Sequence, residues 1–354
     1  HSDINIPFKL NKKVYFLKYH NIIITEEIMG LGGILSQDGL PDTSLDIMTE
    51  KLTRLKKPFL ESFNPSAASR KDRINRIIKL IEENSDDIHS SLSKDFGSRH
   101  EQISQLTDTL ATISHAKHVL KKLDTWIKPE KRKARFPLNL LGSSAHVHFQ
   151  PFGVVGIIAP WNFPISLSLG PLIEVFAAGN NAMMKLSEFV PITSKLLEEL
   201  VNKYFTEDEI VVINGGVETS SNFTSLPFDH LLYTGSTAVA KKVCSAVAAN
   251  LVPVTLELGG KSPIVIGDKA DMKKSAQQIM TGKTVNAGQI CIAPDYTFIA
   301  ESKVDDFVNN AREFIQKSFP TIKNNPDYTS IIHLNHYERL NSMVEDARNK
   351  GAEI

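Results

Sequence analysis

The chain has only two cysteines among its 354 residues, Cys244 and Cys291. Two thiols cannot build a disulfide framework, and neither lies in the Cys-x-x-Cys pattern typical of a metal or redox site. Disulfides are rare in proteins of reducing compartments, so this low cysteine content favours a cytoplasmic protein. We therefore expect a cytoplasmic location.

An excess of either charge is also absent, because 40 Lys and Arg residues balance 40 Asp and Glu residues. Without a basic surplus, nothing drives sequence-independent binding to nucleic acid or to an anionic membrane. No apolar run is long enough to span a bilayer. The apolar run at residues 14–17 is broken by Lys18 and His20 and lacks a clean cleavage site, unlike a signal peptide. We expect neither nucleic acid nor a membrane as a partner.

Two further patterns resemble known sites but lack their context. Asp95-Phe96-Gly97 matches the metal-binding tripeptide of kinases, yet no kinase lysine strand or catalytic loop accompanies it. We interpret it as a helix end. Four histidines stand in two close pairs without carboxylate or cysteine ligands, at positions 115, 118, 146 and 148. We expect no metal site.

The first part of the chain reads as helices. Residues 1–44 show no clear period and are set apart as an uncertain N-terminal extension. From there to about residue 128, apolar side chains recur at helical spacing, and each stripe predicts a face turned to the core. The stripes are Ile47, Leu52, Leu55 and Phe59; Ile74, Ile77, Ile78 and Ile81; and Leu106, Leu110, Ile113 and Leu120.

After residue 150 short apolar runs alternate with helical segments. Continuous apolar runs are typical of strands covered on both faces. We expect strands at 154–158, 181–186, 209–213, 230–233 and 252–256, and helices at 192–204 and 237–250. This alternation predicts an α/β fold with a doubly wound parallel sheet. Residues 144–150 read as a strand or a hairpin arm. Another α/β segment starts near 263, with helices at 302–317 and 337–349.

Five short segments carry the chemistry: Pro-Trp-Asn-Phe-Pro at 160–164, Lys-Leu-Ser-Glu at 185–188, Tyr-Thr-Gly-Ser-Thr at 233–237, Leu-Glu-Leu-Gly-Gly-Lys-Ser-Pro at 256–263 and Asn-Ala-Gly-Gln-Ile-Cys at 286–291. In order and separation they resemble the aldehyde dehydrogenase superfamily, over about residues 45–354. Residues 95–97 with Arg99 and Glu101 resemble its coniferyl aldehyde and class 3 branch. The resemblance implies a helical region and dinucleotide-binding domain at 45–258 and an incomplete catalytic domain at 259–354.

Cys291 is the candidate nucleophile. A thiolate attacks a carbonyl readily and leaves a thioester that water can cleave, which suits oxidation of an aldehyde to an acid. Gly288, three residues earlier, permits a close backbone approach. A small buried hydrophobe is the alternative interpretation of a lone cysteine. It is the better one for Cys244, which lies in a helical pattern with Val239, Val243 and Val247.

Glu257 and Asn162 are the other candidate catalytic residues. Glu257 ends an apolar strand, so we expect partial desolvation, which suits a general base that activates the hydrolytic water. A salt bridge to Lys261 is the alternative. Asn162 stands between two prolines and offers, with the backbone N–H of Cys291, an oxyanion hole. An Asx-turn is the alternative there.

The cofactor site is expected where strands end. By resemblance, Lys185 and Glu188 bind the adenosine ribose, and a Glu there favours NAD over NADP. Gly235 and Ser236 precede a helix at Thr237 whose N-terminus suits the pyrophosphate. Trp161 and Ser187 belong to the same cofactor set by resemblance.

The resemblance also implies an aldehyde substrate and a homodimer. Two alternatives remain open: a CoA-acylating relative, against which Glu257 argues, and an inactive nucleotide-binding relative. Members of the family carry a later Glu-x-Phe-Gly-Pro segment that supplies a carboxylate to the nicotinamide ribose, and nothing here matches it. We therefore expect the 354-residue chain alone to be poorly soluble and nearly inactive.

Overall fold

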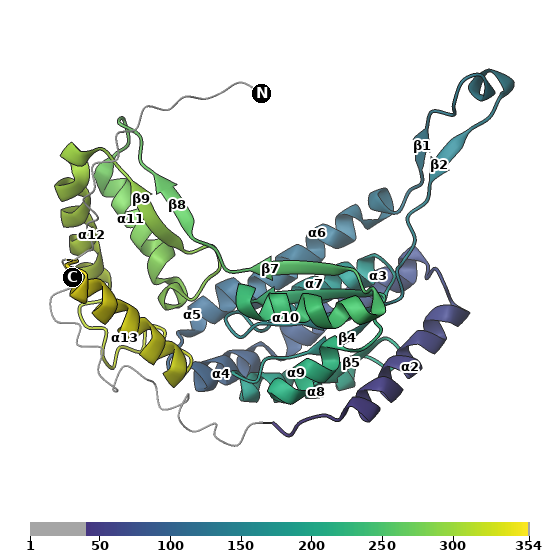
Figure 1. The fold of residues 1–354 in the computed structure, drawn as a ribbon, viewed down its shortest axis with the longest axis horizontal. Helices are drawn as coiled ribbons and strands as arrows, with labels where there is room; N and C mark the ends of the chain where they lie inside the picture. The colour runs from purple at the N-terminus through teal and green to yellow at the C-terminus, as the bar shows by residue number, and fades with distance from the viewer. Residues whose placement is uncertain (1–39, 353–354) are drawn as a thin grey trace.

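A parallel five-stranded sheet forms the centre of the molecule in the computed structural model, which describes residues 40–352 (Figure 1). Its strand order is β5-β4-β3-β6-β7, and every neighbouring pair is parallel. The strands are β3 (Val154–Ile158), β4 (Asn181–Lys185), β5 (Ile210–Ile213), β6 (His230–Gly235) and β7 (Val254–Leu258). The predicted extension at 1–44 and the apolar run at 14–17 lie outside the described residues, apart from residues 40–44.

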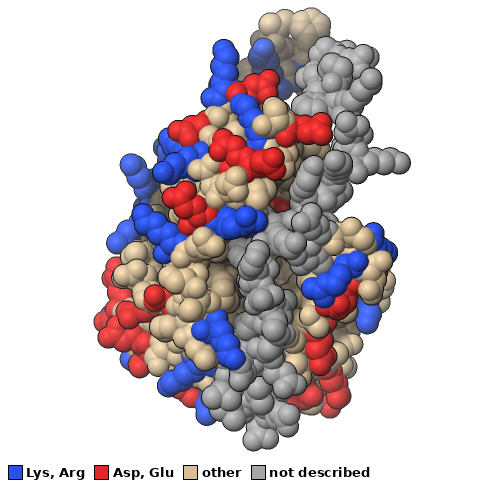
Figure 2. Space-filling model, turned by 90° about the vertical axis from the view of Figure 1, so that its left-hand side faces the viewer, with Lys and Arg blue, Asp and Glu red and all other residues tan. Residues whose placement is uncertain are grey.

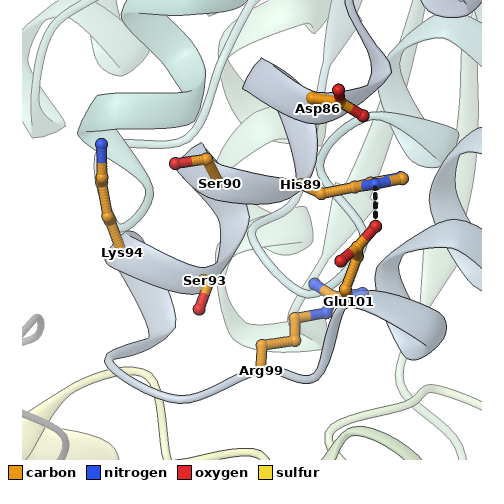
Figure 3. Close-up of a pocket in the computed structure, with 7 residues that line it drawn as sticks. All are labelled: Asp86, His89, Ser90, Ser93, Lys94, Arg99 and Glu101. Carbon is orange, nitrogen blue, oxygen red and sulfur yellow. Dashed lines mark ion pairs between the residues drawn. The ribbon is translucent and has the colours of Figure 1, made fainter.

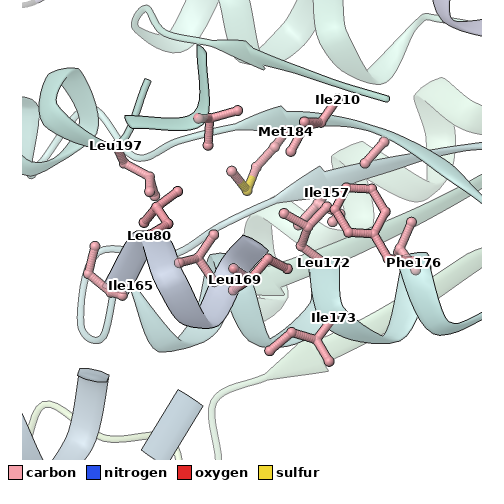
Figure 4. Close-up of a cluster of buried hydrophobic side chains, with 14 of the residues drawn as sticks. Leu80, Ile157, Ile165, Leu169, Leu172, Ile173, Phe176, Met184, Leu197 and Ile210 are labelled. Carbon is pink, nitrogen blue, oxygen red and sulfur yellow. The ribbon is translucent and has the colours of Figure 1, made fainter. Parts of the chain in front are cut away.

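Helices cover both faces of this sheet, so the predicted doubly wound α/β fold is confirmed. One face packs against α3 (Ala67–Glu83), α4 (Ser85–Phe96), α6 (Ala111–Trp126), α7 (Ser166–Ala177) and α8 (Pro191–Tyr204). Figure 4 shows part of this core, where side chains of α7 meet those of β3 and β4. The other face packs against α2 (Leu45–Glu61), α9 (Val217–Thr224) and α10 (Thr237–Val247), which a short turn η4 (Ala248–Asn250) follows.

The predicted helical stripes differ in how well they match the buried residues. All four isoleucines of the α3 stripe are buried, as predicted. The third stripe is wrong at its start, because Leu106 and Leu110 are 65% and 49% exposed. Residues 105–110 form a π-helix, η2, between α5 (Glu101–Ser104) and α6. Its wider turn shifts the helical phase and turns Asp108 and Thr109 inward instead.

Two smaller expectations also differ from the structure. In α2, Met48 rather than Ile47 faces the core, because Met48 lies four residues before Leu52 and so shares its face of the helix. In α10, Val243 and Val247 are buried but Val239 is 45% exposed. Val239 lies in the first turn of α10. Cys244 is accordingly half-buried rather than part of the core.

A second, smaller unit follows β7. Strands β8 (Ser262–Val265) and β9 (Pro294–Phe298) form a parallel pair, and sequence analysis did not predict β9. Helices α11 (Met272–Thr284) and α12 (Val304–Ser318) pack together over it, and η5 (Val285–Gly288) and η6 (Glu301–Lys303) are short turns. Helix α13 (Leu334–Asn349) begins near α4 and runs away from it toward the C-terminus (Figure 1).

The predicted hairpin is present and projects away from the body (Figure 1). It pairs β1 (Glu130–Arg132) with β2 (Ala145–Val147), and η3 (Leu138–Leu141) forms its tip. Among the described residues, no helix has the length and apolar character needed to cross a membrane. Acidic and basic side chains are interspersed on the face shown in Figure 2, in keeping with their equal numbers.

Candidate functional site

The carboxyl ends of the parallel strands gather most of the residues that sequence analysis selected. Lys185 is the last residue of β4, Gly235 is the last of β6, and Glu257 is the next to last of β7. Asn162 follows β3 in the loop that leads to α7. In a doubly wound sheet, ligands bind at this edge, so the fold places the candidate cofactor and catalytic segments at the expected location.

Cys291 lies in what we call the nucleophile loop, residues 285–293. Three consecutive residues of this loop have left-handed backbone conformations: Asn286 (φ 51), Ala287 (φ 53) and Gly288 (φ 74). A glycine suits such a conformation, and at Gly288 an added Cβ would also lie 3.1 Å from the carbonyl oxygen of Lys283. For Ala287 the same conformation costs about 1–3 kcal/mol, which surrounding contacts must offset. The Cys291 side chain at its end is exposed.

Gln289 holds this loop in place. Its side-chain Nε2 donates to the carbonyl oxygens of Asn286 and Ser330, both at 3.0 Å. Its Oε1 accepts from the backbone N–H of Ile332 at 3.1 Å. Sequence analysis gave Gln289 no role of its own, because nothing in the sequence shows that residues 330–332 lie beside it.

Asn162 is joined to the nucleophile loop in both directions. Its side-chain Nδ2 donates to the backbone carbonyl of Gln289 at 3.0 Å, and its own carbonyl accepts from Asn286 Nδ2 at 3.1 Å. A second donor to that carbonyl is Arg99 Nη1, also at 3.1 Å. The amide thus bonds a distant segment rather than closing an Asx-turn within its own loop.

The backbone that follows Glu257, at Gly260, passes close to the nucleophile loop. A Cβ added to Gly260 would lie 3.0 Å from the carbonyl oxygen of Cys291, so this backbone passes close to the candidate nucleophile. The alternative pair with Lys261 is not formed, because Lys261 binds Asp295 at 2.5 Å. The expected partial desolvation of Glu257 is wrong: its side chain is exposed, because β7 is an edge strand whose alternate residues face outward.

Lys185 and Glu188 form a polar pair at the end of β4. Lys185 is 1% exposed, and its Nζ donates to the Leu186 carbonyl at 2.7 Å and to Glu188 Oε2 at 3.2 Å. Burial lowers the pKa of Lys185, and the Glu188 carboxylate opposes that fall. Ser187 is buried between them, where its hydroxyl accepts from the backbone N–H of Phe189.

The N-terminus of α10 stands at the end of β6. The Ser236 hydroxyl accepts from the N–H of Val239, and its carbonyl accepts from that of Ala240. The N–H groups of Thr237 and Ala238 have no acceptor within the helix, because they lie in its first turn. Donors of this kind, with the helix dipole behind them, suit a phosphate. Together with the Lys185–Glu188 pair they fit a dinucleotide.

Trp161 is placed differently from the other candidate cofactor residues. Its ring is half-buried, with the ring of Phe96 at 6.5 Å and that of His336 at 5.2 Å. Packing against α4 and α13 therefore uses part of its surface. Its role toward a cofactor stays a prediction.

Two residues of the tripeptide at 95–97 have structural tasks. Gly97 ends α4 in the left-handed conformation, as the interpretation of a helix end predicts. Asp95 accepts from the backbone N–H groups of Ile192 and Thr193, and so caps the start of α8. Beyond this helix end, Arg99 borders a cavity of about 430 Å³ (Figure 3). His89 and Glu101 pair across it at 3.6 Å.

Comparison with known proteins identifies the class. Residues 54–354 match the model of the aldehyde dehydrogenase family, so the chain belongs to that family. It is 48% identical over 314 residues to "Probable coniferyl aldehyde dehydrogenase" of Caulobacter vibrioides, covering 88% of this chain and 65% of that protein. It is 45% identical over 321 residues to coniferyl aldehyde dehydrogenase of a Pseudomonas species, covering 91% and 66%.

Among solved structures, the substrate-bound state of Staphylococcus aureus AldH is similar, with a TM-score of 0.80 and 35% identity. The match covers 85% of this chain and 65% of that one. The chain thus spans about two thirds of the length of the relatives it matches. The sequence resemblance to the family, and within it to the coniferyl aldehyde and class 3 branch, is confirmed.

Proposed function

We propose that the protein oxidises an aldehyde to the carboxylic acid with NAD, using Cys291 as nucleophile and Glu257 as general base. The observation that carries the proposal is the contact of Asn162 with the nucleophile loop, through the carbonyl of Gln289 at 3.0 Å. It joins an amide donor to the segment that bears the only exposed thiol of the described residues. Both lie at the sheet edge that fits a dinucleotide.

The first bond forms between the sulfur of the Cys291 thiolate and the carbonyl carbon of the aldehyde. The carbonyl oxygen gains negative charge, and the product is a thiohemiacetal on Cys291. Two donors would stabilise this oxygen: the second N–H of the Asn162 amide and the backbone N–H of Cys291. Among the described residues, the latter has no hydrogen-bond partner. Removing one such donor from an enzyme typically costs about a hundredfold or more in kcat.

The second stage releases the acid. NAD, which Lys185, Glu188 and the N-terminus of α10 would hold, would supply the hydride acceptor, so that oxidation of the thiohemiacetal leaves a thioester on Cys291. Glu257 takes a proton from a water molecule, whose oxygen attacks the thioester carbon. The carbon–sulfur bond breaks, which releases the carboxylic acid and regenerates the Cys291 thiolate. Glu257 favours this hydrolysis over acyl transfer to CoA, because a thiol acceptor needs no water-activating base.

Different observations support the choice of cofactor and the choice of substrate. Aldehyde dehydrogenases use a nicotinamide cofactor, NAD or NADP. Glu188 supports NAD, because a carboxylate accepts from the free ribose 2′-hydroxyl and repels a 2′-phosphate. Lys185 and the N-terminus of α10 would hold the ribose and the pyrophosphate. The names of the relatives support an aromatic aldehyde such as coniferyl aldehyde as substrate. We expect the homodimer of the family.

The test is to measure NADH and acid formation from coniferyl aldehyde and from an aliphatic aldehyde, in an active preparation of the protein. Cys291→Ala should abolish both products while NAD binding persists. Cys244→Ala, the matched control, should retain activity, because Cys244 lies within α10. Substantial turnover by Cys291→Ala would refute the mechanism. NAD binding without turnover in the unmodified protein would instead support a nucleotide-binding relative without activity.

A further inference from the structure

We propose that Arg99 is a positioning residue for Asn162, and that its buried pair with Asp108 fixes the oxyanion donor relative to Cys291. This inference rests on the proposed function, because it assigns Arg99 a task in the same reaction. Arg99 touches neither the nucleophile nor the expected cofactor edge. Its effect is transmitted through the backbone of Asn162.

The guanidinium of Arg99 joins the loop of Asn162 to the π-helix η2. Its Nη1 donates to the Asn162 carbonyl at 3.1 Å, and its Nη2 donates to Asp108 Oδ2 at 2.6 Å and to Thr107 Oγ1 at 3.1 Å. The side chains of Arg99 and Asp108 are both 0% exposed. A hydrogen-bonded ion pair in such surroundings is held rigidly, because breaking it leaves a buried charge without a partner.

Asp108 holds the other end of the same loop. Its Oδ1 accepts from the backbone N–H groups of Ile165 and Ser166, at 3.1 and 3.2 Å. These residues begin α7, directly after the Asn162-Phe163-Pro164 stretch. The pair therefore holds the loop at two points: Arg99 binds the carbonyl of Asn162 itself, and Asp108 binds the residues three and four positions later.

Two aromatic rings fix the plane of the guanidinium. Arg99 Cζ lies 4.7 Å from the ring centre of Phe96 and 5.2 Å from that of Phe163. Phe163 is the neighbour of Asn162, so the stacking acts on the same loop. A lysine offers a point charge without a planar fork, and it cannot reproduce three directed hydrogen bonds together with the stacking.

The residue before Arg99 reaches Cys291 by a second route. The Ser98 carbonyl accepts from the N–H of Ser330 at 2.9 Å. The Ser330 carbonyl accepts from Gln289 Nε2 at 3.0 Å. Since the backbone carbonyl of Gln289 accepts from the Asn162 amide, residues 98–99 hold both partners of the contact between Asn162 and the nucleophile loop. A shift of Arg99 alone therefore moves Asn162 against a loop that stays anchored.

The chain offers a matched control in Arg70. It is also buried, at 5% exposed, and its guanidinium makes three hydrogen bonds, to Pro65, Asn64 and Ala177. Ala177 is the last residue of α7, so Arg70 holds the opposite end of the helix whose start Asp108 caps. Arg70 has no contact with Asn162 or the nucleophile loop, which separates a stability effect from a positioning effect.

The experiment is a double-mutant cycle on kcat for aldehyde oxidation, with rates expressed per titrated Cys291 thiol. Asn162→Ala should lower kcat about a hundredfold. Arg99→Lys should lower kcat about tenfold or more while the KM for NAD stays unchanged, because a misplaced donor fails only in the transition state. In the Asn162→Ala background, Arg99→Lys should cause no further loss. Arg70→Lys should keep kcat per thiol within about twofold of the unmodified value. Any loss it causes should be the same with Asn162 present and with Asn162→Ala.

The outcomes of this cycle distinguish a failure of the inference about Arg99 from a failure of the proposed function. If Arg99→Lys lowers kcat equally with and without Asn162, its role is structural and the inference fails while the proposed function stands. If Asn162→Ala itself leaves kcat unchanged, the proposed oxyanion hole is wrong. Should Arg99→Lys lose NAD binding, Asp108→Asn takes its place in the cycle, because it keeps the shape and one acceptor oxygen. An additive effect of Asp108→Asn would equally overturn the inference.

Discussion

The side-chain nitrogen of Asn162 lies 3.0 Å from the backbone carbonyl oxygen of Gln289, a contact between residues 127 positions apart. Gln289 is two residues before Cys291. This one hydrogen bond joins the first segment that sequence analysis selected to the last, and it brings an amide donor to the nucleophile loop. The proposed chemistry depends on that proximity more than on any single residue.

The first prediction concerns Glu257. Glu257→Gln keeps the shape of the side chain but cannot take a proton from water, so hydrolysis of the thioester should slow more than hydride transfer. We expect a rapid burst of NADH, close to one equivalent per active site, followed by slow turnover. Stopped-flow measurement of NADH tests this. Loss of the burst with Cys291 still reactive would show that Glu257 acts before hydride transfer.

Glu188 predicts the choice of cofactor. Glu188→Gln removes the charge that faces a ribose phosphate, so the preference for NAD over NADP should fall about tenfold, which corresponds to about 1.4 kcal/mol. Dissociation constants for both cofactors measure the change. Glu199→Gln on the exposed face of α8 is the control with the same loss of charge, and it should change neither constant. An unchanged ratio in Glu188→Gln would contradict the assignment.

Lys185 predicts a dependence on alkaline pH. Its pKa in the folded protein lies below the ordinary value of 10.5, because burial outweighs the pairing with Glu188. Between the two values the unfolded chain binds more protons, so this residue makes stability rise with pH in that window. NAD affinity should fall over the same window as the ribose loses a charged donor. Titration of NAD affinity against pH tests this, and Lys185→Met should remove the dependence.

Glu209 predicts the response to acid. Burial raises its pKa, but hydrogen bonds from Arg76 and the Thr206 N–H, with the charges of Arg76 and Arg73, outweigh burial and lower it from 4.5 to about 2. Because the folded value is depressed, the stabilisation is complete above pH 4.5 and is lost as pH falls toward 2. It amounts to about 3 kcal/mol.

Glu209→Gln should therefore unfold more easily at neutral pH and show a smaller further loss below pH 4.5. Urea denaturation at several pH values measures both effects. Asp208→Asn is the control: Asp208 makes an exposed pair with Arg54, so it should cost about 1 kcal/mol or less. Equal effects of the two substitutions would contradict the assignment to Glu209.

Most of the regular secondary structure could be predicted from the sequence. Alternating apolar runs and helical stripes define the strands and most helices, since burial on a regular element leaves a regular pattern. The π-helix at residues 105–110 interrupts the regular helical spacing of apolar residues. It turns Asp108 inward, where Asp108 binds Arg99, and this contact is not visible in the local sequence. Strand β9 was missed because its residues 294–298 are largely polar or exposed.

The residues of the candidate site also differ in whether the sequence could reveal them. Short motifs identified Cys291, Glu257 and Asn162, because the chemistry restricts which residue types can occupy those positions. The supporting residues Gln289 and Arg99 were assigned no role, since their importance lies in contacts with segments far away in the sequence. The exposure of Glu257 could not be anticipated either, because a strand reads the same at the edge of a sheet as at its centre until the strand order is known.

Direct observation of an acyl group on Cys291 tests the central claim. Glu257→Gln protein is mixed with coniferyl aldehyde and NAD, quenched in acid within the NADH burst, and examined by intact-mass and peptide mass spectrometry. We predict one acyl group per chain, located on the peptide that contains Cys291, formed only when NAD is present and absent from the Glu257→Gln, Cys291→Ala double variant. An NADH burst without any adduct, or an adduct on another residue, would contradict the proposed mechanism.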